Sequence, residues 1–224
     1  MTGAAQPAKG SRPGNDEPAG QLDSELGGRL PLLTPAELDP DQARLRDHLA
    51  ATRGADARAA GFVLELPGGE VAGPFNAYLR VPGIFQALQQ WAGEIRHYDL
   101  PADVQQVAIL TLGVAWRSDY EVYAHTAEAR HAGVPEDAID AIVAGQPPTG
   151  LSPEADVAHR LTLALAVDHA VGDDLYAEAL GAFGTEKLIA LVNLVGRYMN
   201  TAAVLACFRV PAPPRDPGLG SEIR

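Results

Sequence analysis

The stretch PADVQQVAILTLGVAWRSDYEVYAH, residues 101–125, decides the fold class because it joins two expected helices of different character. Pro101 opens the first helix, and the VQQVAILTLGVAW that follows is apolar on nearly every side. Ser118 begins a second, more polar helix, which we expect to end near Gly133. A helix that is apolar all round has to be covered by other helices, so this stretch predicts a helical core.

Start and stop signals on both sides of this stretch predict further helices. Asp39-Pro40-Asp41-Gln42 supplies an N-cap and a proline for one helix, with Gly54 as its expected stop. Only residues 62–66 and the Pro-Gly-Gly turn after them favour a strand or an irregular excursion. We therefore predict an all-α fold. Its other helices are expected to begin at Pro82, Pro135, Ser152-Pro153, Asp174 and Thr185.

Composition divides the chain into one domain between two tails. Residues 1–30 hold nine Gly or Pro and few large apolar side chains, so they bury too little to offset the entropy of ordering them. The segment 212–224 has the same character. We expect flexible tails at 1–30 and 212–224 and a helical domain at 31–211.

Charge and cysteine content narrow the function classes. The net charge of −12 argues against nucleic acid or an anionic membrane surface as a partner. The single cysteine, Cys207, excludes a Cys-x-x-Cys pair. The longest strongly apolar stretch, residues 107–116, falls short of the roughly 20 residues of a membrane span, and no secretory signal is visible. We expect a cytoplasmic protein.

Glu121 and His125 form the most informative pair because their spacing puts both on one face of the helix that begins at Ser118. A carboxylate beside an imidazole is a usable acid–base pair near neutral pH, and Gln106 on the preceding helix could bond to either. Ser118-x-x-Glu121 is also a capping box, in which Glu121 folds back onto its own helix start. Capping boxes greatly outnumber active sites, so spacing alone favours the structural interpretation.

Several short motifs agree together in order and spacing. They are GPFNAYL at 73–79, Leu100-Pro101 before the helix of Gln106, Tyr120-Glu121 with His125, AGVP at 132–135 and YMN at 198–200. On these motifs, residues 73–210 resemble the carboxymuconolactone decarboxylase superfamily, which also contains the AhpD-type alkylhydroperoxidases. The resemblance implies an AhpD-like helical bundle.

The sequence departs from the redox branch of that superfamily. Peroxidase members carry a Glu, a Cys-x-x-Cys pair and a His, and on that register the four positions are Gln106, Ser118, Glu121 and His125. Without thiolates there is no nucleophile to attack a peroxide and no resolving thiol. We therefore reject a thiol peroxidase and expect the decarboxylase-like branch.

The resemblance then implies a cofactor-independent lyase that acts on a small carboxylated or lactone substrate by acid–base chemistry. Arg96 would anchor a carboxylate, and His125, oriented by Glu121, would deliver a proton. Trp116 and Tyr120 would provide apolar walls. Arg96 also suits a solvated helix end, where the dipole favours a cation.

Three further polar residues, Asn76, Gln106 and Ser118, are candidates for binding the substrate in the same cleft. No His or carboxylate group has metal-ligand spacing and no glycine-rich phosphate loop is present, so we expect neither a metal nor another cofactor.

The helices at 107–114 and 188–205 carry more apolar surface than one small helical layer hides. Relatives usually assemble as trimers or hexamers, so we expect a homo-oligomer, a trimer or a multiple of it. Two alternatives to the lyase stay open: a tailoring or detoxifying enzyme of the same fold with another substrate, and a non-catalytic helical oligomer that binds a ligand.

Overall fold

The computed structural model describes residues 26–213, and over that range the chain is helical. Its only β-type pairing among the described residues is an isolated bridge between Glu65 and Val71, in the segment expected to be irregular. The all-α prediction is confirmed. The α-helices are α1 (Pro40–Ala60), α2 (Pro74–Leu79), α3 (Pro82–Arg96), α4 (Ala102–Ala115), α5 (Asp119–His131), α6 (Glu136–Val143), α7 (Pro153–Leu163) and α8 (Asp173–Phe208).

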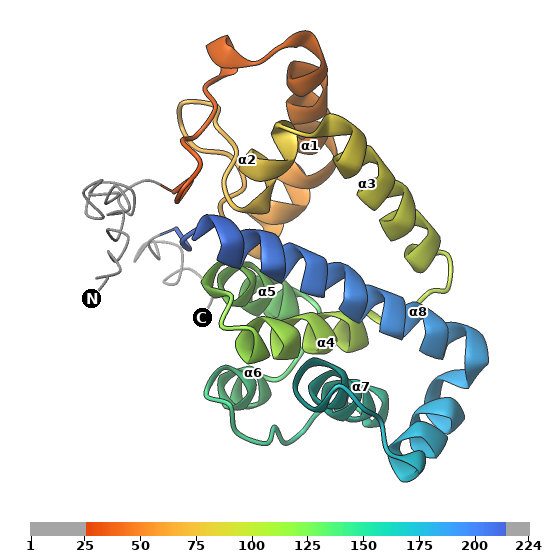
Figure 1. Cartoon of the computed structure of the whole chain (residues 1–224). Coiled ribbons are helices and arrows are strands. Elements are labelled where there is room, and N and C mark those ends of the chain that lie inside the picture. The colour runs from red at the N-terminus through yellow and green to blue at the C-terminus, as the bar shows by residue number, and fades with distance from the viewer. Residues whose placement is uncertain (1–25, 214–224) are drawn as a thin grey trace, which may run out of the picture.

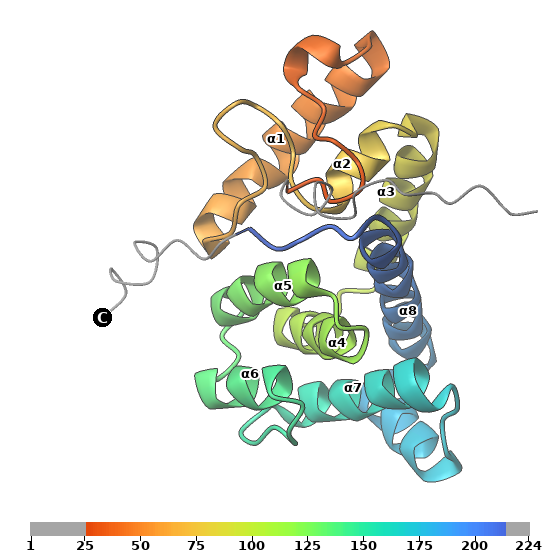
Figure 2. The same cartoon turned by 60° about the vertical axis from the view of Figure 1, so that its left-hand side comes forward.

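Helix α8 crosses the middle of the molecule, with α1, α2 and α3 on one side and α4 to α7 on the other (Figure 1). A second view shows α4 and α5 lying between the α1–α3 group and the α6–α7 pair (Figure 2). The main core forms where α4 packs against α5, α7 and α8. Helix α4 is buried because its sequence is apolar all round, and Val104, Val107, Leu110 and Leu112 are fully enclosed.

Most of the helix starts predicted from proline and serine are present, because a proline in the first turn costs no hydrogen bond. The predicted end of α1 is wrong. Gly54 lies inside the helix, which continues to Ala60 and ends at Gly61 in the left-handed conformation, φ 85°. The short helix α2 was not expected. It follows Gly73, whose φ is 67°, and a Cβ at that position would overlap the ring of Tyr120.

Helix α8 bends at Gly184, which has a non-helical φ of 66°, so the two helices expected around this glycine are joined end to end. By length and composition α8 could cross a membrane, and the length argument made from the sequence therefore does not hold for it. The core helix of a soluble protein meets the same criteria, and α8 packs here against α3, α4 and α7.

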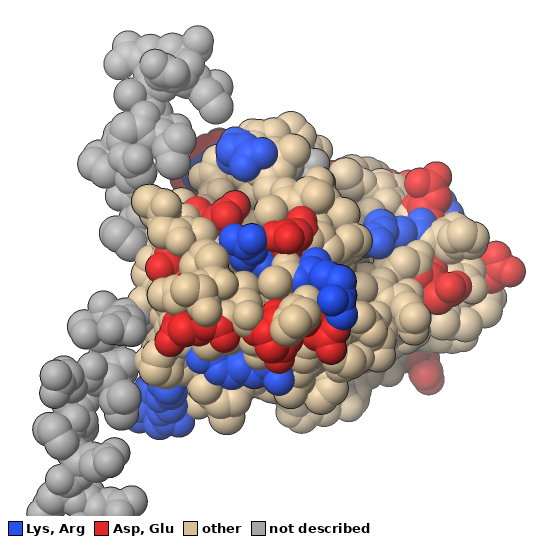
Figure 3. Space-filling view, turned by 90° about the horizontal axis from the view of Figure 1, so that it is seen from above, with Lys and Arg blue, Asp and Glu red and all other residues tan. Residues whose placement is uncertain are grey.

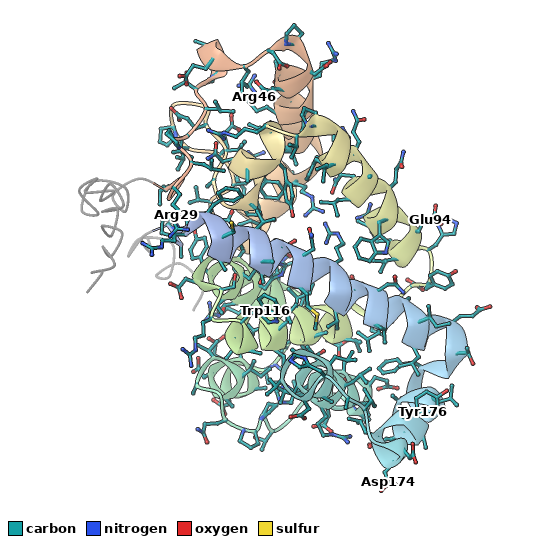
Figure 4. The ribbon with its side chains drawn as sticks, viewed as in Figure 1. Arg29, Arg46, Glu94, Trp116, Asp174 and Tyr176 are labelled. Atoms are coloured by element: carbon teal, nitrogen blue, oxygen red, sulfur yellow. The ribbon has the colours of Figure 1, made fainter. Side chains whose placement is uncertain are left out.

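Residues 26–30, assigned to the flexible N-terminal tail, are docked against the end of α8 (Figure 4). The backbone N–H of Arg29 donates to the Phe208 carbonyl at 2.7 Å, and its guanidinium donates to the Cys207 carbonyl at 2.9 Å. Gly28 fits because a Cβ there would overlap the carbonyls of residues 208 and 209. Residues 26–30 are thus not a flexible tail but part of the described fold. Of the expected C-terminal tail, Ala212 and Pro213 are described, and Pro213 is buried; residues 1–25 and 214–224 lie outside the described residues.

Candidate active site

A cavity of about 560 Å³ lies where α1, α2 and α3 face α5 and α8. Each of these helices contributes side chains, and the loop between α1 and α2 closes one wall. Charged side chains from α1, α3, α5 and α8 meet aromatic and aliphatic groups, most of which come from α2, α3 and that loop. The polar and charged lining consists of His48, Thr52, Arg53, Tyr78, Gln89, Arg96, Tyr120, Glu121, His125, Glu128, Arg197, Tyr198 and Thr201, and the apolar lining of Phe62, Leu64, Pro74, Phe75, Phe85, Leu88 and Ala124.

Helix α5 brings Glu121 into this wall, and the side chain is only 2% exposed. Neither carboxylate oxygen finds a hydrogen-bond partner among the described residues, and Ser118 makes no capping bond to the helix. The capping-box interpretation favoured by spacing is therefore wrong. A buried polar group without a partner is rare in folded proteins and points to a role in binding or chemistry.

Burial raises the pKa of Glu121 to about 8, because a carboxylate loses its hydration in this wall. The nearby Ser118 hydroxyl and the Arg197 guanidinium oppose this rise, and both effects are smaller than that of burial. At neutral pH the side chain is thus mainly a neutral carboxylic acid, which can donate a proton.

His125, one turn further along α5, has a pKa that is shifted in the opposite direction. Burial, together with the positive charges of Arg53 and Arg197, lowers its pKa to about 3. Its Nδ1 lies 2.8 Å from Oε1 of Gln106, and because that oxygen can only accept, Nδ1 carries the hydrogen. Nε2 is then an unprotonated acceptor. The ring meets Tyr198 edge to face, with centroids 5.0 Å apart.

Three arginines, Arg53 on α1, Arg96 on α3 and Arg197 on α8, line the cavity. Burial lowers the pKa of Arg53, which interacts electrostatically with Arg197, Arg96 and Glu128. The Nε of Arg197 is buried without a partner among the described residues. Arginine presents a planar fork of donors that matches a carboxylate, so this group favours an anionic ligand.

Two tyrosines complete the walls. Tyr120 donates from its hydroxyl to the carbonyl of Val63 at 3.3 Å, and burial raises its pKa. Tyr78 donates to Oδ1 of Asn200 at 3.3 Å, and burial raises its pKa also.

The structure brings together four of the eight candidate residues: Arg96, Tyr120, Glu121 and His125 all line the cavity. Gln106 stands behind His125 and holds its ring, and Ser118 is buried beside Glu121; neither lines the cavity.

Asn76 and Trp116 lie elsewhere, contrary to expectation. The Asn76 amide bonds to the backbone of residues 30 and 33 and to Arg80, so its role is to tie the N-terminal segment to α2. Trp116, the residue that follows the last turn of α4, is 39% exposed and does not line the cavity.

Sequence reasoning missed Arg53 and Arg197. Arg197 carried a usable signal, since it is the only charged residue between 188 and 208, in the middle of a long apolar helix. Arg53 carried none, because it stands in a polar helix among other arginines.

Comparisons with known proteins give a family match over part of the chain and a structural match to the fold. The model of the carboxymuconolactone decarboxylase family matches residues 82–173, which include Arg96, Glu121 and His125. No curated protein matches the sequence significantly. A crystal structure described as an alkylhydroperoxidase AhpD core, an uncharacterized peroxidase-related protein from Ralstonia eutropha JMP134, shares the fold with a TM-score of 0.63 and 12% identity, covering 83% of this chain and 92% of that chain. Residues 82–173 thus match the carboxymuconolactone decarboxylase family, and the chain shares the fold of the AhpD core structure.

Proposed function

We propose that the protein is a cofactor-independent lyase of the carboxymuconolactone decarboxylase type, acting on a small carboxylated or lactone substrate by acid–base chemistry. The observation that carries this proposal is the opposed protonation of Glu121 and His125 within one arginine-lined cavity. Two titratable groups whose environments push their pKa values apart are the usual basis for assigning an acid and a base.

The roles differ from those expected from the sequence. His125 was expected to deliver a proton with help from Glu121, but its lowered pKa makes it a poor donor and leaves Nε2 as an acceptor. Glu121 holds a proton at neutral pH and is the donor in our proposal. Gln106 is a positioning residue, because its amide oxygen fixes which nitrogen of His125 is unprotonated.

The proposed reaction requires no oxidant or reductant. The arginines hold the substrate carboxylates, and the bond between the leaving carboxylate and its carbon breaks as carbon dioxide departs. The electron pair of that bond passes into a conjugated carbonyl, and the proton of Glu121 neutralises the resulting carbanion or enolate. Glu121 regains its proton from water. Where the product shifts a double bond, Nε2 of His125 accepts the proton removed from carbon.

A thiol peroxidase is not part of this proposal, although the structurally similar protein is described as peroxidase-related. Cys207 is the single cysteine of the sequence and does not line the cavity. Peroxide reduction by a dithiol pair requires a second thiol within reach of the first.

The test is to incubate the purified protein with carboxymuconolactone and follow the ultraviolet absorbance. We expect turnover above the buffer rate, reduced by about 100-fold or more in the Glu121→Gln variant, which has no proton to donate. The matched control is Glu94→Gln, an exposed glutamate on α3, which should retain full activity. A wild-type rate equal to that in buffer would remove this substrate. If a panel of other carboxylates and lactones were also bound without turnover, the non-catalytic ligand-binding alternative would replace the lyase.

We also propose, in line with the sequence analysis, that the protein is cytoplasmic and forms a homo-oligomer. This oligomer is a trimer or a multiple of a trimer. Its support is a set of exposed apolar side chains, Val167 before α8 and Tyr176, Ile189 and Val192 on α8.

A further inference from the structure

The cavity is larger than a one-ring carboxylate requires. At the volume of about 30 Å³ that a water molecule occupies in the liquid, 560 Å³ corresponds to roughly 19 water-sized groups. Pockets of this size usually enclose ligands of more than one ring. The volume left over after a one-ring carboxylate is bound at the arginines can therefore hold a further part of the ligand.

The three arginines of the cavity form one electrostatically linked group. Arg53 interacts electrostatically with Arg96 and Arg197, and both Arg53 and Arg197 act on the ring of His125. These three arginines share the cavity with two carboxyl groups, Glu121 and Glu128. Because Glu121 is neutral at pH 7, the lining carries a local excess of positive charge in a chain whose net charge is −12. On the outer face seen from above, by contrast, acidic and basic side chains are interspersed (Figure 3).

The apolar groups of the lining include an aromatic and aliphatic cluster from α2 and α3. The rings of Phe75 and Phe85 meet edge to face with centroids 6.1 Å apart, and Phe85 also contacts Tyr78 at 5.4 Å. Leu88, one turn further along α3, packs on the same cluster, and both Leu88 and Phe75 are half-buried at the cavity. An aromatic wall left partly open has apolar surface that a ligand can cover.

We infer that the ligand of this site is an amphipathic anion, a carboxylate joined to an apolar group of about two rings. Its carboxylate binds at Arg53, Arg96 and Arg197, and its apolar body packs on Phe75 and Leu88. The inference rests on the proposed function for the choice of site, and deepens it by naming the substrate class.

The test compares two probes that share a carboxylate and differ in apolar size, benzoate and biphenyl-4-carboxylate, by isothermal titration calorimetry with the full chain. We expect the biphenyl probe to bind about tenfold more tightly or better, because its second ring is removed from water. Leu88→Trp, which fills the apolar side, should weaken the biphenyl probe by about fivefold or more and leave benzoate within about twofold. Arg53→Gln should weaken both probes.

The matched control is Ile84→Trp, the same substitution one turn earlier on α3 at a side chain that is 58% exposed and outside the cavity. It should change neither affinity. Equal affinities for the two probes, or no binding of the biphenyl probe, would overturn the inference. A chain that binds the biphenyl probe as expected but turns over no carboxylate or lactone keeps the ligand class and loses the lyase. A chain that turns over carboxymuconolactone and binds the probes equally keeps the lyase and loses the ligand class.

Discussion

Replacing Glu121 by Gln should stabilise the protein at neutral pH, since the carboxyl is buried without a partner among the described residues and its pKa is raised to about 8. In the unfolded chain its pKa returns to about 4.5. The folded state thus binds more protons between these values, so the contribution of Glu121 to stability is greatest below pH 4.5 and is lost as the pH rises to 8. An amide keeps the shape of the neutral acid and never ionises.

The size of the effect follows from the interval between the two pKa values. At about 1.4 kcal/mol per pH unit, the free energy of unfolding of wild type is lower by ~3 kcal/mol at pH 7, which is about 2.5 pH units above the unfolded pKa. No discount for solvent applies, because Glu121 is 2% exposed. For a chain of this length, that difference corresponds to an increase in melting temperature of about 6–12 °C.

Urea unfolding of both proteins at pH 4.5, 6, 7 and 8 measures this difference. We expect the Glu121→Gln variant and wild type to have nearly equal free energies of unfolding at pH 4.5 and to diverge as the pH rises. Glu94→Gln, at an exposed site on α3, is the matched control and should stay within about 0.5 kcal/mol of wild type (Figure 4). A difference that does not change with pH, or a Glu121→Gln variant less stable than wild type at pH 7, would refute the reasoning.

Four further expectations can be checked. His125→Asn should remove a group whose pKa is lowered to about 3, so its stability relative to wild type, measured by urea unfolding, should rise as the pH falls from about 6.5 towards 3. Gly73→Ala should lower the free energy of unfolding by ~3 kcal/mol, because its Cβ meets Tyr120 in a left-handed conformation; Gly133→Ala, with φ 81° and open space, should lose only ~1 kcal/mol. Deleting residues 26–30 together with 1–25 should lower the melting temperature by several degrees relative to deleting 1–25 alone, since 26–30 bond to the end of α8, and equal values would contradict that docking. Light scattering should give a multiple of the 23.5 kDa chain mass, and a value near that mass would contradict an oligomer.

The helices were predictable where their signals are local. Pro82, Pro101 and Ser152 mark starts because a fixed φ or a capping hydroxyl acts within one turn. The end of α1 was not predictable in this way, since Gly54 and Gly61 offer equivalent stops and only the packing of the last turn decides between them. The docking of residues 26–30 depends on carbonyls about 180 positions away, which no local pattern reveals.

Part of the candidate site was also predictable, where its residues are close in sequence. Glu121 and His125 share a helix face, so their spacing identified them, although it also suggested a cap that the structure lacks. Their protonation could not be read from the sequence, because burial and two arginines from α1 and α8 determine it. The meeting of Arg53 with Arg197 depends on the tertiary fold alone.

The central claim is that Glu121 is a neutral acid and His125 a neutral base in the same cavity, and NMR titration tests it most directly. Side-chain carboxyl ¹³C shifts of glutamate and ring ¹⁵N shifts of histidine are followed from pH 4 to 9, with the two signals assigned by their loss in Glu121→Gln and His125→Asn. We predict a Glu121 midpoint near pH 8 and a His125 ring that keeps its hydrogen on Nδ1 without titrating above pH 5. A Glu121 midpoint near 4.5 together with a His125 midpoint near 6.5 would contradict the account.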